Sequence, residues 1–235
     1  EKYDSPQALV EILSRQLTQW ELKYGKGEDE ETLSGRFAGV IRRACEQSGR
    51  GVVVLVDEYD KPLLQALGDD ALLDDYRKTL KAFYGVLKSS DRYLRFVFLT
   101  GVTKFAQVSV FSDLNQLNDI SLDFAYATLC GITKEELGST FVPELERQAA
   151  VNDMTSEAVM EMMTRRYDGY HFHPKGAGVF NPFSVLNSFS KQEFGSYWFQ
   201  TGTPTFLVEL LKESDYDLRL LMDGIETAAS AFTEY

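Results

Sequence analysis

Two adjacent carboxylates, Asp57 and Glu58, are the residues of this chain best placed to do chemistry. They directly follow five apolar residues, Val52–Val56, four of which are β-branched. So short an apolar run predicts a strand buried on both faces, as in a parallel sheet. Ligand sites in open α/β sheets lie at the carboxyl ends of such strands. We therefore expect Asp57 to hold Mg²⁺ and Glu58 to polarise a water for attack on a phosphate. The alternative is a strand that ends in an acidic turn.

A second apolar segment, Leu94–Leu99, is expected to pair with the first. Between them, residues 72–87 carry the apolar spacing of a long amphipathic helix. A strand, a helix and a second strand in this order predict adjacent parallel strands with a right-handed crossover. Asp57 and Thr100 should then lie side by side at one edge of the sheet.

The loop that begins at Thr100 supplies further candidates for a nucleotide site. Thr100, at the end of the second strand, is a candidate to contact a phosphate or its attacking water, or else it satisfies only its own turn. Thr103 and Lys104 are candidate nucleotide-binding residues. Lys104 would offset transition-state charge on a phosphate, or its side chain would extend over a neighbouring ring instead. Asp60 and Lys61 are expected to close the loop after the first strand by a local ion pair.

Two other polar groups are weaker candidates. His171 and His173 lie near Asp168, but an H-x-H pair lacks the third and fourth ligands that zinc requires. A surface or hydrogen-bonding role is therefore favoured for the histidines. Arg165 and Arg166 could serve as an arginine finger, yet their predicted place at a helix C-terminus accounts for them without function.

Seven sequence blocks, taken in order, resemble the bacterial AAA-ATPase-like family. They are DEYDKPLL at 57–64, RFVFLTGVTKF at 95–105, FSDLN at 111–115, DISLD at 119–123, YDGYHF at 167–172, NPFS at 181–184 and YWFQTGTPTFL at 197–207. In that family a P-loop ATPase is usually followed by a restriction-endonuclease-like nuclease domain. The resemblance implies ATP and Mg²⁺ as cofactors, a Walker B role for Asp57 and Glu58, and gating of the nuclease domain or a partner protein.

One departure from the family is pronounced. The Walker A pattern G-x-x-x-x-G-K-[ST], which cradles phosphates, occurs nowhere in the chain. We therefore expect a fragment of a longer parent protein, inactive by itself, that starts after Walker A and stops before the nuclease domain. A second hypothesis is an ATPase-like binding module that does not hydrolyse ATP.

The predicted fold class is α/β, a partial P-loop NTPase (AAA-like) parallel sheet with a C-terminal α-helical lid domain. The expected domains are residues 1–130 for the core and 131–235 for the lid. Asp119–Leu122 could add a short third strand, and no strand is expected beyond Gly131. In the family's sheet order the missing first strand leaves two unpaired edges, which proteins seldom tolerate. The sheet should therefore be completed by the missing piece of the parent protein, rearranged, or completed by another molecule.

Composition restricts the classes of partner. The net charge is −12, from 24 basic and 36 acidic residues, so direct nucleic-acid binding by this chain is not expected. No apolar run approaches the roughly 20 residues that span a bilayer. Cys45 and Cys130 are expected to be buried, reduced thiols of a cytoplasmic protein. The many large rings between Tyr167 and Phe206 predict one aromatic core in the lid, docked on the loop at residues 100–105.

Overall fold

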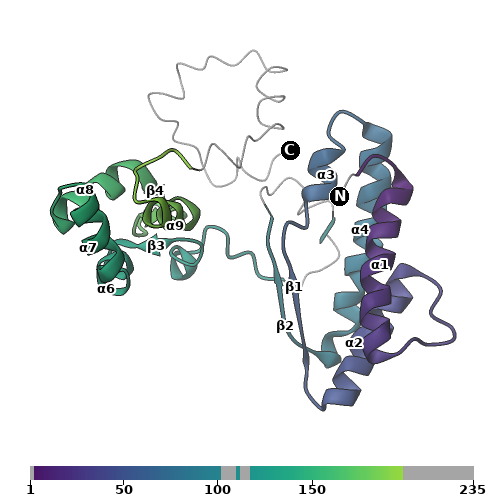
Figure 1. Cartoon of the computed structure of the whole chain (residues 1–235). Coiled ribbons are helices and arrows are strands. Elements are labelled where there is room, and N and C mark those ends of the chain that lie inside the picture. The colour runs from purple at the N-terminus through teal and green to yellow at the C-terminus, as the bar shows by residue number, and fades with distance from the viewer. Residues whose placement is uncertain (1–2, 102–109, 112–116, 198–235) are drawn as a thin grey trace. The chain divides into compact units, whose positions relative to one another are not determined.

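The computed structural model describes residues 3–101, 110–111 and 117–197 (Figure 1). These residues form a mixed α/β structure, as predicted, in two compact units that divide between Leu117 and Asn118. The predicted domain boundary at residue 130 and the lid role of the second part stay predictions. Thr103 and Lys104 lie outside the described residues, as does most of the loop on which the lid was expected to dock. No helix in the described part is long and apolar enough to cross a membrane.

Two N-capped helices open the first unit. Helix α1 (Pro6–Tyr24) begins at Ser5, whose hydroxyl accepts a hydrogen bond from a backbone N–H of the first turn, and its first residue is proline. Helix α2 (Leu33–Ser48) begins at Thr32. The hydroxyl of Ser34, in the first turn, donates a hydrogen bond of 2.9 Å to the carbonyl of Ala82 in a third helix.

The two predicted strands are adjacent and parallel. Strand β1 (Val52–Val56) pairs with β2 (Leu94–Leu99), which confirms the expected arrangement. The short helix α3 (Lys61–Gln65) and the long helix α4 (Asp70–Ser89) connect them, followed by the 3₁₀ turn η1 (Asp91–Tyr93). Helices α1, α2 and α4 lie on one side of this two-stranded sheet (Figure 1).

Aromatic rings join the three long helices into one core. Trp20 of α1 stacks on Phe37 of α2 with a centroid distance of 5.9 Å, and Phe37 stacks on Phe83 of α4 at 4.6 Å. Tyr76 and Leu80 of α4 are almost fully buried in the same core. Because the same helical stripes carry these residues, the periodicity of the sequence accounts for the packing.

Only one face of the sheet packs on this core. Val54 and Val97 pack against the helices, whereas Val53, Leu55 and Phe96 point away and are 53%, 69% and 54% exposed. The expectation of strands buried on both faces is therefore wrong for the described residues. An apolar run shows that a strand can be buried on both faces, but it does not supply the second layer.

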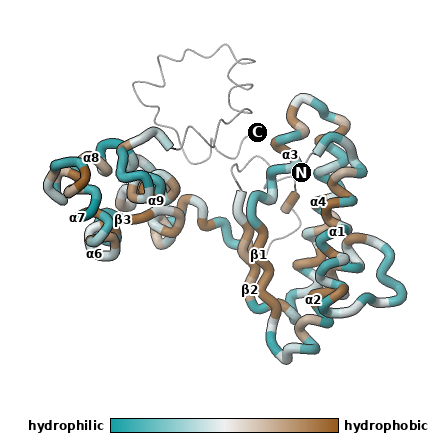
Figure 2. The backbone as a smooth tube through the Cα atoms, viewed as in Figure 1, coloured by the Kyte–Doolittle hydropathy of each residue, from teal (hydrophilic) through white to brown (hydrophobic). Residues whose placement is uncertain are grey.

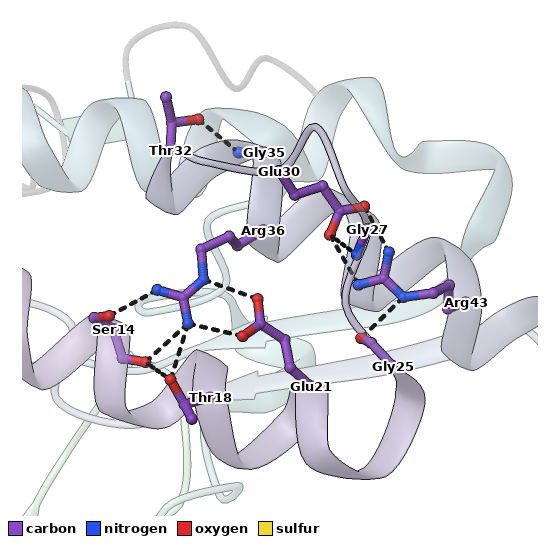
Figure 3. A network of polar contacts seen from close by, with 10 residues as sticks. All are labelled: Ser14, Thr18, Glu21, Gly25, Gly27, Glu30, Thr32, Gly35, Arg36 and Arg43. Atoms are coloured by element: carbon purple, nitrogen blue, oxygen red, sulfur yellow. Dashed lines mark hydrogen bonds and ion pairs between the residues drawn. The ribbon is translucent and has the colours of Figure 1, made fainter.

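Two ion pairs connect α1, α2 and the loop between them. Arg36 donates two hydrogen bonds to the Glu21 carboxylate, both of 2.8 Å, and both side chains are nearly buried (Figure 3). Arg43 makes a second two-point pair with Glu30. Hydrogen bonding to Arg36 lowers the pKa of Glu21, and hydrogen bonding to Arg43 lowers the pKa of Glu30.

The second unit combines helices with a small antiparallel sheet. Its elements are η2 (Phe124–Tyr126), β3 (Ile132–Thr133), α6 (Lys134–Thr140), α7 (Val142–Val151), α8 (Ser156–Tyr167), β4 (Asp168–Tyr170), β5 (Val179–Phe180) and α9 (Pro182–Lys191). The strand order is β3-β5-β4, with both pairs antiparallel. Two expectations are therefore wrong: strands do occur beyond Gly131, and residues 119–122 form no strand.

The described rings of the second unit do not all enter its core. Tyr167 and Tyr197 are buried, with centroids 6.4 Å apart, but Tyr170 and Phe183 are 40% and 43% exposed. The last rings of the predicted set lie in residues 198–235, outside the described residues. The cysteine prediction is also corrected: Cys45 and Cys130 are free thiols, but the first is half-buried and the second is exposed.

Candidate functional site

Thr100 brings the two candidate carboxylate residues together at the carboxyl ends of β1 and β2. Its hydroxyl donates a hydrogen bond to the carboxylate of Asp57 and accepts one of 3.3 Å from the backbone N–H of Glu58. The structure thus places three of the predicted site residues, Asp57, Glu58 and Thr100, in direct contact. One hydroxyl group links the ends of two neighbouring strands.

Backbone hydrogen bonds extend the strand pairing into the site. The N–H of Thr100 donates to the carbonyl of Val56 at 2.8 Å, and its carbonyl accepts from the N–H of Tyr59 at 3.0 Å. Thr100 is therefore held through its backbone N–H, its carbonyl and its side chain. Such a position on rigid elements keeps a polar group within the narrow tolerance that catalysis requires.

Glu58 adopts a backbone conformation that is unusual for its residue type. Its φ is +53°, in the left-handed region that L-residues other than asparagine and aspartate seldom occupy. Such a conformation costs about 1 kcal/mol and persists where surrounding structure imposes it. Here the hydrogen bonds at Thr100 and Tyr59 impose it, and they turn the chain sharply after Asp57.

The Glu58 carboxylate is held by a neighbouring cation. Lys61, at the start of α3, donates to Glu58 Oε2 at 2.7 Å, and both side chains are about half exposed. An exposed pair of this kind contributes little to stability, on the order of 0–1 kcal/mol. It does fix the carboxylate close to the strand ends, where it can still exchange partners.

Sequence reasoning missed the packing beneath this turn. Asp60 is fully buried, although the pattern assigned it only to a local ion pair. A Cβ added at Gly101 would lie 2.6 Å from the ring of Tyr59 and 3.0 Å from the carboxylate of Asp60. Position 101 therefore requires glycine, because Tyr59 and Asp60 leave no space for a side chain there. The signal available in the sequence was a glycine directly after the second strand, opposite the acidic loop.

The weaker candidates do not assemble into a site. His173 Nδ1 accepts from the backbone N–H of Lys175, and Arg166 donates to the carbonyl of Phe194. Within the described ranges no group of three or more His, Cys, Asp or Glu side chains is placed to hold a metal ion. These contacts agree with the structural roles that were favoured for His173 and Arg166.

The geometry at Asp57 suits a cation that keeps most of its water ligands. The Asp57 carboxylate is exposed and lies beside a hydroxyl, so the available ligands are hard oxygen atoms. Magnesium is bound in this way, through one or two carboxylates together with phosphate oxygens and water, rather than in a protein cage. The oxygen ligands at this position are therefore of the kind that Mg²⁺ binds.

A surface depression elsewhere in the first unit lacks comparable chemistry. It has a volume of about 410 Å³ and is lined by Ser14, Thr18, Glu21, Leu22, Lys26 and Arg36. Two of its charged lining groups, Glu21 and Arg36, already bond to each other (Figure 3). We regard this network as a structural clamp between α1 and α2.

Comparison with known proteins finds a family that the first part of the chain matches. Residues 1–111 match the model of the AAA-ATPase-like family, described as predicted AAA-ATPase. The "Uncharacterized protein in vnfD 5'region" of Azotobacter chroococcum mcd 1 is 45% identical over 178 residues. This match covers 76% of the present chain and 32% of that relative, so the chain spans about a third of its length. No solved structure matches the chain significantly.

Proposed function

Residues 1–111 belong to the AAA-ATPase-like family, and on this premise we propose that the chain is part of an ATP-binding and ATP-hydrolysing module. The observation that carries the proposal is the contact of Thr100 with both Asp57 and Glu58 at the ends of two parallel strands. Ligand sites of open α/β sheets lie at such strand ends. Two acids and a hydroxyl are the groups that a hydrolytic phosphate site requires there.

Each residue has a separate role in this proposal. The Asp57 carboxylate binds Mg²⁺, and the Thr100 hydroxyl orients that carboxylate. Glu58 orients the attacking water and accepts its proton. When bound with ATP, Mg²⁺ supplies positive charge that offsets the charge of the phosphates. Thr103 and Lys104 are proposed to contact the nucleotide from the loop after β2.

The proposal requires a phosphate-binding segment that this chain does not contain as a Walker A motif. Two carboxylates alone repel phosphates, so the backbone amides and lysine of such a segment are needed for nucleotide binding. We propose that the parent protein supplies them beside the sheet. Closure around ATP would then gate an attached nuclease domain or a partner protein. With its net charge of −12, the present chain is not proposed to touch nucleic acid itself.

Calorimetric titration of the parent protein with ATP, with and without Mg²⁺, tests the proposal. We expect Asp57→Ala to weaken ATP binding about tenfold or more in Mg²⁺, because a direct or water-mediated ligand is lost. Binding without Mg²⁺ should change little. Asp74→Ala, which removes an exposed acid on α4, is the matched control and should bind as the wild type does. Equal Mg²⁺-dependent affinity of Asp57→Ala and wild type would contradict the assigned role.

A second candidate function is a binding module in which hydrolysis is negligible. The Glu58–Lys61 ion pair favours it, because a carboxylate oxygen that already accepts from Lys61 is not available to orient a water molecule. In that case the closure of the module on ATP would transmit a signal without turnover. The two functions differ in their response to Glu58→Gln, which should matter only if the water is activated by that side chain.

A further inference from the structure

Hydrogen bonds fix the backbone of Glu58 on both sides. Its N–H donates to the Thr100 hydroxyl at 3.3 Å, and its carbonyl accepts from the N–H of Lys61 at 3.1 Å. These two bonds hold the left-handed φ of +53° in the turn after β1. In Figure 2 both strands of the sheet are coloured hydrophobic along most of their length, and this turn is coloured hydrophilic. The fold therefore sets the direction in which the Glu58 side chain leaves the backbone, but not its rotamer.

Lys61 also restrains the side chain of Glu58. Its ammonium donates to Oε2 at 2.7 Å, so Lys61 contacts Glu58 through both its backbone and its side chain. Among the described residues, the second carboxylate oxygen, Oε1, accepts no hydrogen bond. One oxygen of the carboxylate is thus held, and the other keeps its acceptor sites for a further donor such as water.

Buried neighbours fix the position of Lys61 itself. Lys61 is the first residue of α3, and Pro62, which follows it, is buried and has the fixed φ of proline. Asp60 and Leu63 are fully buried on either side of these two residues, and the N–H of Leu64 donates to the Asp60 carbonyl at 2.9 Å. The backbone of Lys61 is therefore held in place, although its ammonium is exposed.

The orientation of Glu58 is the property that this ion pair can control. An exposed ion pair adds only about 0–1 kcal/mol to stability. A general base, however, must lie within hydrogen-bond reach of the water whose proton it accepts, and a displacement of about 1 Å can lower a rate about a hundredfold. An unrestrained glutamate on a surface samples many rotamers. The contact with Lys61 therefore matters more for the rate of a reaction than for the stability of the fold.

We propose that Lys61 is a positioning residue for Glu58, which holds Oε2 so that Oε1 is presented to the attacking water. The inference rests on the proposed ATPase function and adds a residue to it. Lys61 acts through Glu58 in this proposal and does not bind the nucleotide. The ion pair then supports hydrolysis, whereas in the non-hydrolysing module the same pair would only occupy the carboxylate.

Steady-state ATP hydrolysis by the parent protein tests this role. We expect Lys61→Met to lower kcat about tenfold and to leave KM within about twofold of the wild type, because the base loses its orientation and the nucleotide loses no contact. Lys61→Arg can still donate to Oε2 and should keep kcat within about threefold of the wild type. Lys78→Met removes an exposed lysine of α4 and, as the control for charge, should leave kcat unchanged.

A double-mutant cycle with Glu58→Gln shows whether Lys61 acts through Glu58. In the Glu58→Gln background, Lys61→Met should change the residual kcat by less than about twofold, because the group that it positions is already lost. A loss of about tenfold in both backgrounds would mean that Lys61 acts independently of Glu58, which contradicts the proposal.

Carbodiimide coupling in the purified chain tests the contact without any measurement of activity. The reagent joins a carboxylate to an amine that lies against it, so it should form an amide between the side chains of Glu58 and Lys61. Mass spectrometry should then find the peptide that contains both residues lighter by one water molecule. Neither Lys61→Arg nor Glu58→Gln should give this product.

Further outcomes would overturn the proposal in different ways. Absence of the coupled product in the wild-type chain would show that the contact does not form. If the parent protein hydrolyses ATP, an unchanged kcat in Lys61→Met would remove the positioning role, and an increased kcat would show that the ion pair restrains Glu58 instead. Turnover at the buffer rate in the wild-type parent would contradict the ATPase proposal itself, and the positioning role would fall with it even if the coupled product forms.

Discussion

The hydroxyl group of Thr100 makes hydrogen bonds with two residues of the candidate site. Thr100 donates to the Asp57 carboxylate and accepts from the Glu58 N–H, so its loss would disturb a side chain and a strained backbone turn together. The Glu58 turn has a positive φ and depends on that acceptor. At the scale of single residues, the site is thus a small network with Thr100 at its centre.

Substitution of Thr100 tests that network in the isolated chain. Thr100→Val keeps the shape of the side chain but leaves the Glu58 N–H without its acceptor, and should lower the free energy of unfolding by about 1–2 kcal/mol. Thr100→Ser retains the hydroxyl and should stay within about 0.5 kcal/mol of the wild type. Urea denaturation followed by circular dichroism measures both. Equal losses in the two variants would show that the hydroxyl has no special role.

The Glu21–Arg36 pair predicts a dependence of stability on pH. Hydrogen bonding to Arg36 lowers the pKa of Glu21 below its ordinary value of 4.5. The pair therefore stabilises the fold fully above the unfolded-state pKa, and this contribution is lost as the pH falls through the lower folded-state pKa. Glu21→Gln should cost about 2–3 kcal/mol near pH 6 and less near pH 3, as urea denaturation at the two pH values would measure. Glu11→Gln, at an exposed position of the same helix, should have little effect at either pH.

At the scale of elements, two helical glycines should respond oppositely to alanine. A Cβ at Gly39 of α2 would collide with the carboxylate of Glu30, whereas a Cβ at Gly85 of α4 would meet no atom within 4 Å. Gly39→Ala should therefore displace Glu30 from Arg43 and destabilise the chain by about 1–3 kcal/mol. Gly85→Ala should stabilise it by about 0.5–1 kcal/mol through helix propensity. Thermal unfolding of both variants measures these changes, and stabilisation by Gly39→Ala would contradict the role given to the Glu30–Arg43 pair.

Long helices and strands could be predicted from the sequence, whereas strands of two residues could not. The strands of five and six residues and the long helix α4 between them were predicted because an apolar pattern accumulates over many positions. Ile132–Thr133 and Val179–Phe180 contain only two residues each, which is too short for any period to appear. Their pairing depends instead on tertiary contacts around α8 and α9.

The candidate site was predictable in part for the same reason. The positions of Asp57 and Thr100 follow directly from the ends of two predicted parallel strands. The positive φ of Glu58, its pairing with Lys61 and the burial of Asp60 depend on how the loops pack, and no local pattern specifies them. The exposed face of the β1–β2 sheet was missed because an apolar run is the same whether or not a second layer is present.

At the scale of the whole molecule, the chain alone should not turn over ATP. Asp57, Glu58 and Thr100 are proposed to activate water and hold a cation, but without Walker A amides and lysine the phosphates are not cradled. Phosphate release from ATP by the purified chain in Mg²⁺ should be indistinguishable from buffer. Turnover that disappears in Asp57→Ala would show that the chain contains its own phosphate-binding segment.

The steady-state rate of ATP hydrolysis by the parent protein, compared with its Glu58→Gln variant, tests the central claim most directly. The amide keeps the shape of the side chain but cannot accept a proton, so the loss should appear in kcat. We predict a fall in kcat of about a hundredfold or more, with ATP affinity within about threefold of the wild type. Glu46→Gln, on the exposed surface of α2, is the control for charge and should leave kcat unchanged. Equal kcat values for wild type and Glu58→Gln would contradict the account, and turnover at the buffer rate in both proteins would leave the non-hydrolysing binding module as the function.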